Sequence, residues 1–395
     1  MRLLVVTSSF PRHAHDHAGR FVLDLSLGLS AAGETVEHIA PWEDGCSEKE
    51  TLEGGVAVRR FRYGSRWLPE SLAYGDGLGA NLQRSPIRRV LQLPAFLRGM
   101  RRAVTQRLRE ETFDCVLSHW LIPGAWASTR VSIPHMAICH GGDIHALSRW
   151  PMGARLLASI TRRTQHVFFV SEDLRRRAGS LLAARGVPMP NCSVVPMGVD
   201  ASAFGSAVGV ADNAGEKIIL AVGRLVHLKG FDTLIQAAST LCGARVVVVG
   251  DGPERASLEQ LARSLNAAVE FRGHQSPSAL PSHYAEADIV CIPSRVGPRG
   301  RAEGHPMVLA EAMTTGTCVV ASRSGGLTAA LEGTGGGVLF EPDDVDGLAA
   351  ILQDLIDDGI KLRRISEEAR SRGPEFDRAR TAESVRKVGY TLING

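Results

Sequence analysis

Two glutamates, Glu303 and Glu311, lie eight residues apart in a stretch rich in Ala, Leu and Met. We expect a helix over Glu303–Thr315, with Pro306 in its first turn. In a helix this spacing is about 12 Å along the axis, roughly the length of a sugar plus a diphosphate. The helix start would offer N–H groups and a positive dipole end to the phosphates, and the carboxylates would bind hydroxyls at either end. An ordinary amphipathic helix with two solvent-facing glutamates is the alternative.

Two cations follow an apolar run that ends at Gly223. Arg224 lies on the next turn, and Lys229 lies at the start of a helix expected over Phe231–Leu241. Two cations placed in this way could converge on one doubly charged phosphate group. A solvated basic turn is the alternative.

Three loops in the first half also carry candidate residues. Gly19 ends the loop Ser8–Arg20 just before a helix, where a missing Cβ lets the backbone approach a ligand, although a plain helix-start turn would also use glycine. His140 ends an apolar run and is followed by two glycines, which would expose its ring; a histidine that caps the strand is the alternative. The stretch around His119 and Trp120 ends the preceding run and would form a wall of the same pocket.

Two patterns that resemble metal sites are weak. His13, His15 and His17 alternate, but no matching cluster of ligands accompanies them, so we expect no bound metal. A D-x-D pattern at residues 344–346 matches that of metal-dependent sugar transferases. Because it precedes a helix-forming segment, we interpret it as a helix cap.

Apolar strand-like runs alternate with helix-length segments along the whole chain, which predicts parallel sheets covered by helices on both faces. A length of 395 residues favours two domains. A linker of small and polar residues, Ala201–Gly215, separates two Rossmann-like units, and a cleft between such units is the expected binding site. The expected strands are 2–8, 35–41, 113–119, 134–140, 166–171, 217–223, 244–250, 268–273, 287–293 and 317–322. The expected helices, besides those named above, are 20–32, 93–109, 154–163, 172–185, 254–265, 278–287 and 345–357.

Composition excludes several classes of protein. The seven Cys form no C-x-x-C pair and several lie in apolar runs, so they indicate a reducing compartment and neither a disulfide framework nor a zinc site. The N-terminal apolar run is too short for a signal peptide, and no run approaches a membrane span, so we expect a cytoplasmic protein. A net charge of +3 gives no reason to expect nucleic acid.

Nine short motifs occur in order over nearly the full length of the chain. They are HAGR (17–20), HGGD (140–143), VVPMGVD (194–200), AVGRLVHLKG (221–230), VVVGDGPE (247–254), EFRG (270–273), AEADIVCIPS (285–294), EGHPMVLAEAM (303–313) and SRSGG (322–326). Together they resemble the retaining GT-B glycosyltransferases of family four, the glycosyltransferase group 1 type. Glu303 and Glu311 match the E-x7-E motif of that family.

The resemblance implies two Rossmann-like domains whose parallel sheets face a central cleft. Residues 1–200, with a C-terminal helix within 375–395, would form the acceptor domain, and residues 201–374 the nucleotide-sugar donor domain. The implied enzyme moves a hexose from a nucleotide diphosphate, UDP first and GDP second, to a hydroxyl of a glycan, lipid-linked or small-molecule acceptor. It would keep the anomeric configuration and would require neither a metal nor another cofactor. It would act in glycan or natural-product biosynthesis.

The resemblance also assigns roles to residues of this chain. Arg224 and Lys229 would bind the donor diphosphate, with Gly19 approaching it from the other domain. Glu303 would hold the sugar hydroxyls, Glu311 the ribose, and His140 the sugar near the bond that breaks. The implied catalytic residues are His140, Arg224, Lys229 and Glu303; donor binding would add Gly19, Glu311, the backbone at Gly304, His305, Met307, Val308 and Leu309, and, beside the nucleobase, Arg272 and His274.

Two features depart from the family pattern. His305 stands where a bulky apolar or aromatic residue is frequent, which leaves the identity of the sugar open. The loop Arg295–Arg301 adds three arginines, which would either bind an anionic sugar or acceptor or be solvated.

In family-like chemistry, charge builds up on the departing diphosphate. Arg224, Lys229 and the helix start would stabilise this charge in place of a metal, and the leaving phosphate would accept the acceptor's proton. A nucleotide-sugar epimerase or hydrolase, or a non-catalytic sugar-nucleotide binding module, is the alternative function.

The sequence indicates less about the acceptor than about the donor. From Arg84 to Arg109 the chain has eight arginines and no acidic residue, interleaved with apolar residues. Such a stretch could lie peripherally on an anionic membrane at its inner face, which would suit a lipid-linked acceptor. A solvated helix face is the alternative.

Overall fold

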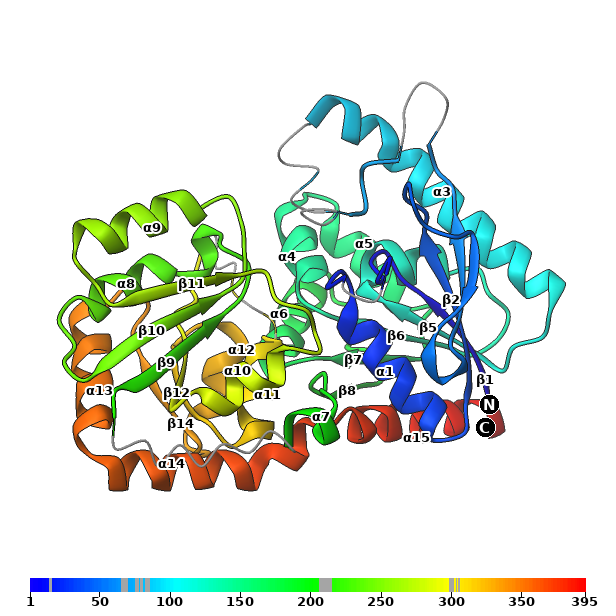
Figure 1. Ribbon diagram of the computed structural model, residues 1–395. Coiled ribbons are helices and arrows are strands. Elements are labelled where there is room, and N and C mark those ends of the chain that lie inside the picture. Colours follow the sequence, from blue (N-terminus) through cyan, green and yellow to red (C-terminus); the bar gives the residue numbers. More distant parts are fainter. Residues whose placement is uncertain are drawn as a thin grey trace. The chain divides into compact units, whose positions relative to one another are not determined.

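The computed structural model describes residues 1–13, 16–64, 70–74, 78, 81, 86–205, 215–297, 302, 304 and 306–395. Contacts divide the chain into two compact units, Met1–Pro196 with Arg378–Gly395, and Met197–Asp377. Each unit is a largely parallel sheet with helices packed on it (Figure 1). The expected class of fold, with two Rossmann-like α/β domains, is confirmed.

The first unit contains an eight-stranded sheet in the order β3-β4-β2-β1-β5-β6-β7-β8, in which β3 runs antiparallel to β4 and the other described pairs are parallel. The C-terminal helix α15 packs along α1 (Figure 1). The strands are β1 Arg2–Val6, β2 Thr35–Pro41, β3 Lys49–Thr51, β4 Ala57–Phe61, β5 Cys115–His119, β6 His135–Cys139, β7 His166–Phe169 and β8 Cys192–Val194. The helices are α1 Arg20–Ala31, α3 Pro86–Glu110, α4 Gly142–Arg149, α5 Gly153–Thr161, α6 Glu172–Ala183 and α15 Arg378–Asn394, with shorter turns η1 Glu53–Gly55 and η2 Trp120–Ala125.

The second unit contains a six-stranded parallel sheet in the order β11-β10-β9-β12-β13-β14. Counted along the chain, this is the 3-2-1-4-5-6 order of dinucleotide-binding folds. The strands are β9 Lys217–Val222, β10 Ala244–Val249, β11 Val269–Gly273, β12 Ile289–Ile292, β13 Cys318–Ser322 and β14 Gly337–Phe340. The helices are α7 Ala201–Gly205, α8 Phe231–Ala238, α9 Arg255–Ser264, α10 Leu280–Glu286, α11 Met307–Thr315, α12 Gly325–Leu331, α13 Val345–Asp357 and α14 Gly359–Arg372, with turns η3 His227–Lys229 and η5 Gly373–Phe376.

Both sheets have a topological switch point, where the direction of strand addition reverses. It lies between β1 and β5 in the first unit and between β9 and β12 in the second. In open parallel sheets, ligands bind outside the carboxyl ends of the strands at this point. The loops that leave β1, β5, β9 and β12 are therefore the places to look for a site.

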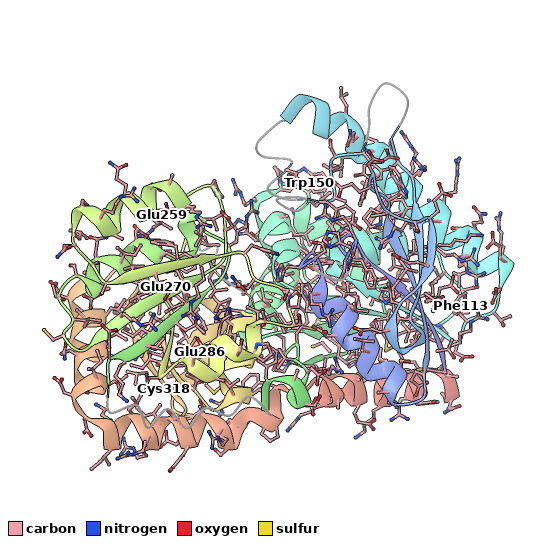
Figure 2. All side chains as sticks on the ribbon, in the orientation of Figure 1. Phe113, Trp150, Glu259, Glu270, Glu286 and Cys318 are labelled. Atoms are coloured by element: carbon pink, nitrogen blue, oxygen red, sulfur yellow. The ribbon has the colours of Figure 1, made fainter. Side chains whose placement is uncertain are left out.

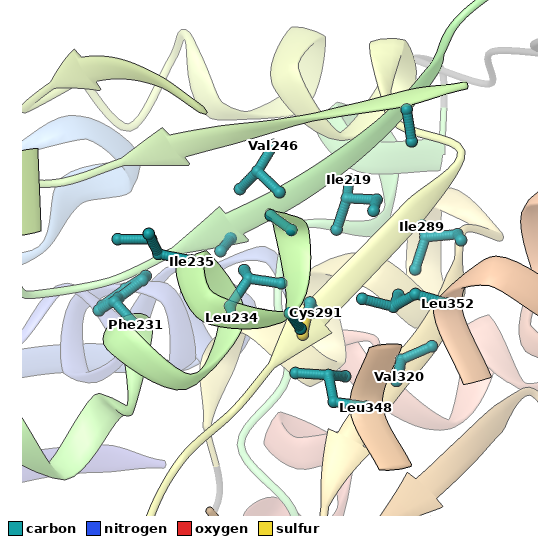
Figure 3. Close-up of a cluster of buried hydrophobic side chains, with 14 of the residues drawn as sticks. Ile219, Phe231, Leu234, Ile235, Val246, Ile289, Cys291, Val320, Leu348 and Leu352 are labelled. Carbon is teal, nitrogen blue, oxygen red and sulfur yellow. The ribbon is translucent and has the colours of Figure 1, made fainter. Parts of the chain in front are cut away.

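The central strands of the second unit are buried on both faces, which explains their continuous apolar sequences. On one face Ile219, Val246 and Ile289 pack against Leu234 of α8 and Leu352 of α13 (Figure 3). Neighbouring strand residues point to the other face and pack against α10 and α11; they include Leu220, Val247, Val290 and Val319. Burial on both sides fixes the strand positions, and thereby the loops at their ends.

Several elements differ from the sequence prediction. The prediction did not include β3, β4, β8 and β14, or the helices α4, α7, α12 and α14. α3 begins at Pro86, earlier than expected, and contains Pro94. α11 begins at Met307, so the expected helix start at Glu303 is wrong.

Candidate active site

The carboxyl end of β9 carries the two candidate cations of the second unit. Gly223 follows β9 with φ +153°, and Arg224 and Lys229 lie half-buried on the turn that leads into α8. The Cε of Lys229 lies 3.5 Å from the position that a Cβ on Gly223 would take. The Lys229 stem therefore lies over the end of β9, which borders the switch point of this sheet.

Backbone contacts join this turn to the loop that leaves β12. Gly230 has φ +65°, and a Cβ on it would lie 2.0 Å from the carbonyl oxygen of Pro293. The N–H of Arg295 donates a 2.8 Å hydrogen bond to the carbonyl oxygen of Leu228. Only glycine fits at 230, because both the backbone conformation and the neighbouring carbonyl exclude a side chain.

Arg295 strengthens the same junction. Its Nη2 donates to Asp232 Oδ2 at 2.7 Å and to Thr233 Oγ1 at 3.2 Å, and its Nε binds Asp343. The prediction that Arg295 binds a ligand or is solvated is therefore wrong, because carboxylates of the same unit hold its guanidinium. The other two arginines of this loop lie outside the described residues.

α11 follows the β12 loop and carries Glu311. Pro306 precedes the helix with an extended backbone, ψ 128°, so the first helical N–H groups belong to the residues from Met307 onward. The hydroxyl of Tyr284, which is fully buried, donates to Glu311 Oε2. Burial, followed by the Glu311 charge, raises the pKa of Tyr284, so this hydroxyl keeps its proton and fixes the carboxylate.

The E-x7-E spacing does not span a helix in this structure. Glu303 and His305 lie outside the described residues, and both precede the first residue of α11. The assumption of helical rise from residue 303 onward, from which about 12 Å between the two carboxylates was estimated, is therefore wrong, and the distance itself involves a residue outside the described ranges. Gly304, Met307, Val308 and Leu309 lie at or just before the helix start, as the family pattern requires of a backbone phosphate site.

Arg272 and His274 flank the end of β11. Arg272 donates at 2.9 Å to both Glu270 and Glu286, which are labelled in Figure 2, and it contacts His283 at the same distance. Its guanidinium would have to exchange these partners to bind a nucleobase. His274 is exposed.

In the first unit, the ring of His140 lies among three other rings. His119 Nδ1 lies 2.9 Å from His140 Nε2, and the two imidazoles are nearly parallel, with centroids 5.1 Å apart. The centroids of Trp120 and Phe21 lie 4.9 Å and 4.8 Å from that of His140. Phe21 belongs to the first turn of α1, His119 ends β5, Trp120 begins η2 and His140 follows β6, so the structure brings together the expected pocket wall and the candidate histidine.

Asp143 joins the loop after β5 to the loop after β6. Its carboxylate is buried and accepts hydrogen bonds from the N–H groups of Leu121 at 2.8 Å, Gly141 at 2.9 Å and Ile144 at 3.0 Å. Sequence reasoning missed this role, although an aspartate in the first turn of a helix is a signal for capping. The contacts explain how His140 is held in position.

Gly19 is the N-cap residue that precedes α1, with φ +67°, and a Cβ there would lie 2.3 Å from the carbonyl oxygen of Ser9. The chain's own backbone therefore requires glycine at this position. Gly19 precedes Phe21 by two residues, so its loop also sets the ring that packs on His140. The candidate residues thus form two groups, one in each unit.

The expected helix cap at residues 344–346 is confirmed. Asp344 Oδ1 accepts a 2.9 Å hydrogen bond from the N–H of Gly347 at the start of α13. Within the described ranges, no group of three or more His, Cys, Asp or Glu side chains could hold a metal ion. His15, one of the three alternating histidines, lies outside those ranges.

The basic stretch forms most of α3. Phe96, Met100 and Val104 are buried, whereas Arg98, Arg102 and Arg109 are exposed. Leu91 is 64% exposed on the same helix. Two further arginines have structural partners: Arg101 stacks on Trp126, and Arg107 binds Glu37. Throughout the described part of the chain, no helix is long and apolar enough to cross a membrane.

Acid should destabilise the first unit. Burial lowers the pKa of His119 to about 3 and that of His135 to about 4, against 6.5 in an unfolded chain. Below pH 6.5 the unfolded chain binds protons that the folded unit does not, so stability is full above that pH and falls as the pH decreases. Between pH 7 and pH 5.5 we expect a loss of about 1 kcal/mol for each residue.

Tryptophan fluorescence can test this prediction, because all five Trp lie within residues 1–196. The urea midpoint of the fluorescence transition should fall between pH 7 and pH 5.5. His135→Gln, which cannot titrate, should flatten this dependence. A midpoint that does not change with pH would contradict the prediction.

Both units combine a Rossmann-type strand order with polar loops at a switch point, which defines a two-domain nucleotide-binding α/β protein. A family model described as "Glycosyltransferase Family 4" matches residues 18–203, and one described as "Glycosyl transferases group 1" matches residues 209–372. D-inositol 3-phosphate glycosyltransferase of Kineococcus radiotolerans is 30% identical over 416 residues, covering 93% of this chain and 88% of that protein. The chain belongs to the group 1 glycosyltransferases and is an enzyme of that class.

Two further similarities are informative. A GDP-mannose-dependent alpha-(1-6)-phosphatidylinositol monomannoside mannosyltransferase of Mycobacterium tuberculosis is 30% identical over 237 residues, 56% of this chain and 60% of that protein. The crystal structure of Anabaena HepE in complex with UDP-glucose has a TM-score of 0.71 at 20% identity, covering 99% of this chain and 100% of that chain. This second likeness is one of fold.

Proposed function

We propose that the protein transfers a hexose from a nucleotide-diphosphate sugar, with a UDP-sugar as the favoured donor, to an acceptor hydroxyl with retention of configuration. The observation that carries this proposal is the junction at the switch point of the second unit. There, Arg224 and Lys229 lie on a turn fastened through Gly230 and Arg295 to the loop that leads into α11. Such a junction fits a group that carries two phosphates.

The chemistry follows from the charge that develops as the sugar–phosphate bond breaks. The sugar becomes oxocarbenium-like while negative charge collects on the diphosphate. Fixed cations stabilise that charge more in the transition state than in the ground state, because they need not reorganise. Gly230 and Arg295 hold the turn of Lys229 in place before the donor binds, which supports this preorganised role.

Retention requires the acceptor to attack from the face that the diphosphate leaves. On that face, a phosphate oxygen of the leaving group can accept the proton of the acceptor hydroxyl, so no side-chain base is needed. His140 would contact the sugar from the first unit, Glu303 would bind its hydroxyls, and Glu311, held by Tyr284, would bind the ribose. Arg224, Lys229 and the helix start would perform the role that a divalent cation has in metal-dependent transferases.

The two comparisons support different donors. Anabaena HepE was solved with UDP-glucose, whereas relatives named for GDP-mannose match between 56% and 76% of this chain. We keep a UDP-sugar as the first donor on the family resemblance, with UDP-glucose as its test compound and GDP-mannose as the second donor. The name of the Kineococcus relative suggests D-inositol 3-phosphate as a first acceptor to test.

The test incubates the protein with UDP-glucose or GDP-mannose, with and without D-inositol 3-phosphate or a mannoside acceptor. Sugar transfer that depends on acceptor, with an α-linked product, supports the proposal. Nucleotide released equally fast without acceptor would indicate a hydrolase. Binding of a donor in a thermal-shift assay without any turnover would indicate a binding module.

We extend the proposal to the acceptor side, where α3 would touch an anionic membrane. Arg98, Arg102 and Arg109 are exposed, and Leu91 is available to enter the interface. Flotation with vesicles containing anionic lipid should recover the protein at low salt, and Arg98→Glu with Arg102→Glu should abolish recovery. Equal recovery of both proteins, or none at low salt, would remove the membrane contact.

A further inference from the structure

His119 and His140 share one hydrogen bond, and this contact limits how His140 can meet a ligand. The Nε2 atom of His140 faces Nδ1 of His119 at 2.9 Å, and the two ring planes lie within 7° of parallel, so the rings meet edge to edge. His140 makes no other hydrogen bond to the described part of the chain, so Nδ1 is the ring nitrogen left for a ligand. A neutral imidazole carries one proton, and its position decides whether Nδ1 donates or accepts.

Both rings are neutral near pH 7. Burial lowers the pKa of His119 to about 3, and burial together with the His119 ring lowers the pKa of His140 well below 6.5. A single proton therefore lies between the two nitrogens. Either His119 donates and His140 carries its own proton on Nδ1, or His140 donates and its Nδ1 is an acceptor.

The second nitrogen of His119 distinguishes these arrangements. His119 Nε2 is buried and has no hydrogen-bond partner among the described residues. If His140 were the donor, His119 would carry its proton on Nε2, as a buried N–H without an acceptor. Orphaned buried N–H groups are rarer in folded proteins than acceptors with an unused lone pair. The arrangement in which His119 donates from Nδ1 avoids this defect.

His38, in the same unit, is a second buried histidine with one ring nitrogen that has no partner in the described chain. The hydroxyl of Ser26 donates to the carbonyl oxygen of Val22 at 3.0 Å, so its oxygen accepts from His38 Nε2 at 2.9 Å. The remaining His38 nitrogen, Nδ1, is buried without a partner in the described chain and therefore carries a lone pair. At His38, the imidazole nitrogen without a partner in the described chain is therefore the unprotonated one.

We propose that His119 is a positioning residue, which donates from Nδ1 to His140 Nε2 and thereby keeps the His140 proton on Nδ1, directed to the donor sugar. This inference rests on the proposed function, since it assigns the sugar to His140. It names a hydroxyl oxygen of the hexose as the partner of Nδ1–H. Trp120, at φ +62°, and Phe21 pack on the His140 ring and prevent it from turning to exchange its nitrogens.

Two substitutions at position 119 distinguish the effect of the hydrogen bond that His119 donates from the effect of the space that its side chain fills. In His119→Asn, the amide nitrogen lies two bonds from Cβ, as Nδ1 does, so a donor remains. In His119→Leu, a side chain closer in volume to histidine removes the donor. If His119 acts through its N–H, the smaller asparagine should be the better replacement, with kcat within about twofold of the parent, and leucine should lower kcat about tenfold.

The tautomer of His140 can be determined by NMR without measuring enzyme activity. In uniformly nitrogen-15-labelled protein, long-range correlation spectra distinguish protonated from unprotonated ring nitrogens, and His140→Gln identifies the His140 signals. We expect a protonated Nδ1 and an unprotonated Nε2 for His140 in the parent and in His119→Asn. In His119→Leu the two nitrogens should show averaged shifts, because nothing then fixes the proton.

Three results would overturn the inference: a protonated Nε2 on His140 in the parent, an unchanged tautomer in His119→Leu, or equal kcat for the two variants. If His119→Leu does not fold, the parent spectrum alone decides the tautomer. Failure of the proposed function has a different signature, because the parent would then transfer no sugar while the His140 spectrum would still be readable.

Discussion

Lys229→Ala should lower kcat about 100-fold or more while leaving the fold intact. The side chain lies half-buried over Gly223 at the end of β9, where the departing diphosphate would gain charge. Removing one fixed donor from such a site typically costs a factor of 10²–10³, or roughly 3–4 kcal/mol of transition-state stabilisation. The measurement is kcat and KM with a saturating acceptor. Because the loss falls on the transition state, kcat should fall by a larger factor than KM rises.

Lys361→Ala is a matched control for this prediction. Lys361 pairs with Asp354 on the surface of the same unit, near the amino end of β13 and not at the carboxyl strand ends where the ligand is expected, so its removal should leave kcat unchanged. Glu303→Gln should reduce kcat by a similar factor to Lys229→Ala, since it removes the charge proposed to bind the sugar. EDTA should have no effect on the parent. Full activity in both active-site variants, or loss of activity with EDTA, would refute the assignment of roles.

The central strands could be predicted from the sequence because of where they lie in each sheet. Residues such as Val247 and Val248 are buried on opposite faces, so neither position tolerates a polar side chain and the run becomes continuously apolar. Strands near the edge of a sheet lack this constraint. β4, which is second from the edge, contains Arg59 and Arg60, and the buried guanidinium of Arg60 is satisfied by Glu50 on β3, the carbonyl oxygen of Pro11 and the hydroxyl of Tyr74. A search of the sequence for apolar runs therefore misses β4.

The start of α11 shows why element boundaries are harder to predict. Proline suits the first helical position, so Pro306 favoured a helix that already included Glu303. In the structure Pro306 is the residue before the helix, with its backbone extended. The loop from β12 fastens onto the β9 turn through Gly230 and Arg295, a tertiary contact that the sequence pattern around Pro306 does not reveal.

The positions of the candidate residues at strand ends could be predicted, but their contacts could not. His140 and the pair Arg224 and Lys229 follow apolar strands, and parallel strands end at one edge of a sheet. The contact between His119 and His140 depends on strand register, in which His119 of β5 pairs with Ile138 of β6. Register cannot be read from this sequence, because β5 and β6 are buried on both faces and their apolar runs do not show which residue faces which side.

Gly230→Ala should destabilise the second unit by about 4 kcal/mol and displace the Lys229 turn. Two effects add at this position. An L-residue at φ +65° costs about 1–2 kcal/mol, and forcing a methyl group into packed structure costs about 1–3 kcal/mol. The methyl group would lie 2.0 Å from the Pro293 carbonyl oxygen, which is backbone and cannot rotate away.

Gly333→Ala separates the two effects. Gly333 has nearly the same φ, +68°, but a Cβ there would meet nothing within 4 Å. This variant should lose only the conformational part, about 1–2 kcal/mol, and keep full activity.

Urea unfolding followed by circular dichroism measures the stability of the two variants. The unfolding transition that causes no change in tryptophan fluorescence belongs to residues 197–377. Because Gly230 joins the β9 turn to the β12 loop, its variant should also lose turnover at urea concentrations where it is still folded. If the two variants lost equal stability, the backbone contact at Pro293 would not be what holds the turn of Arg224 and Lys229 in place.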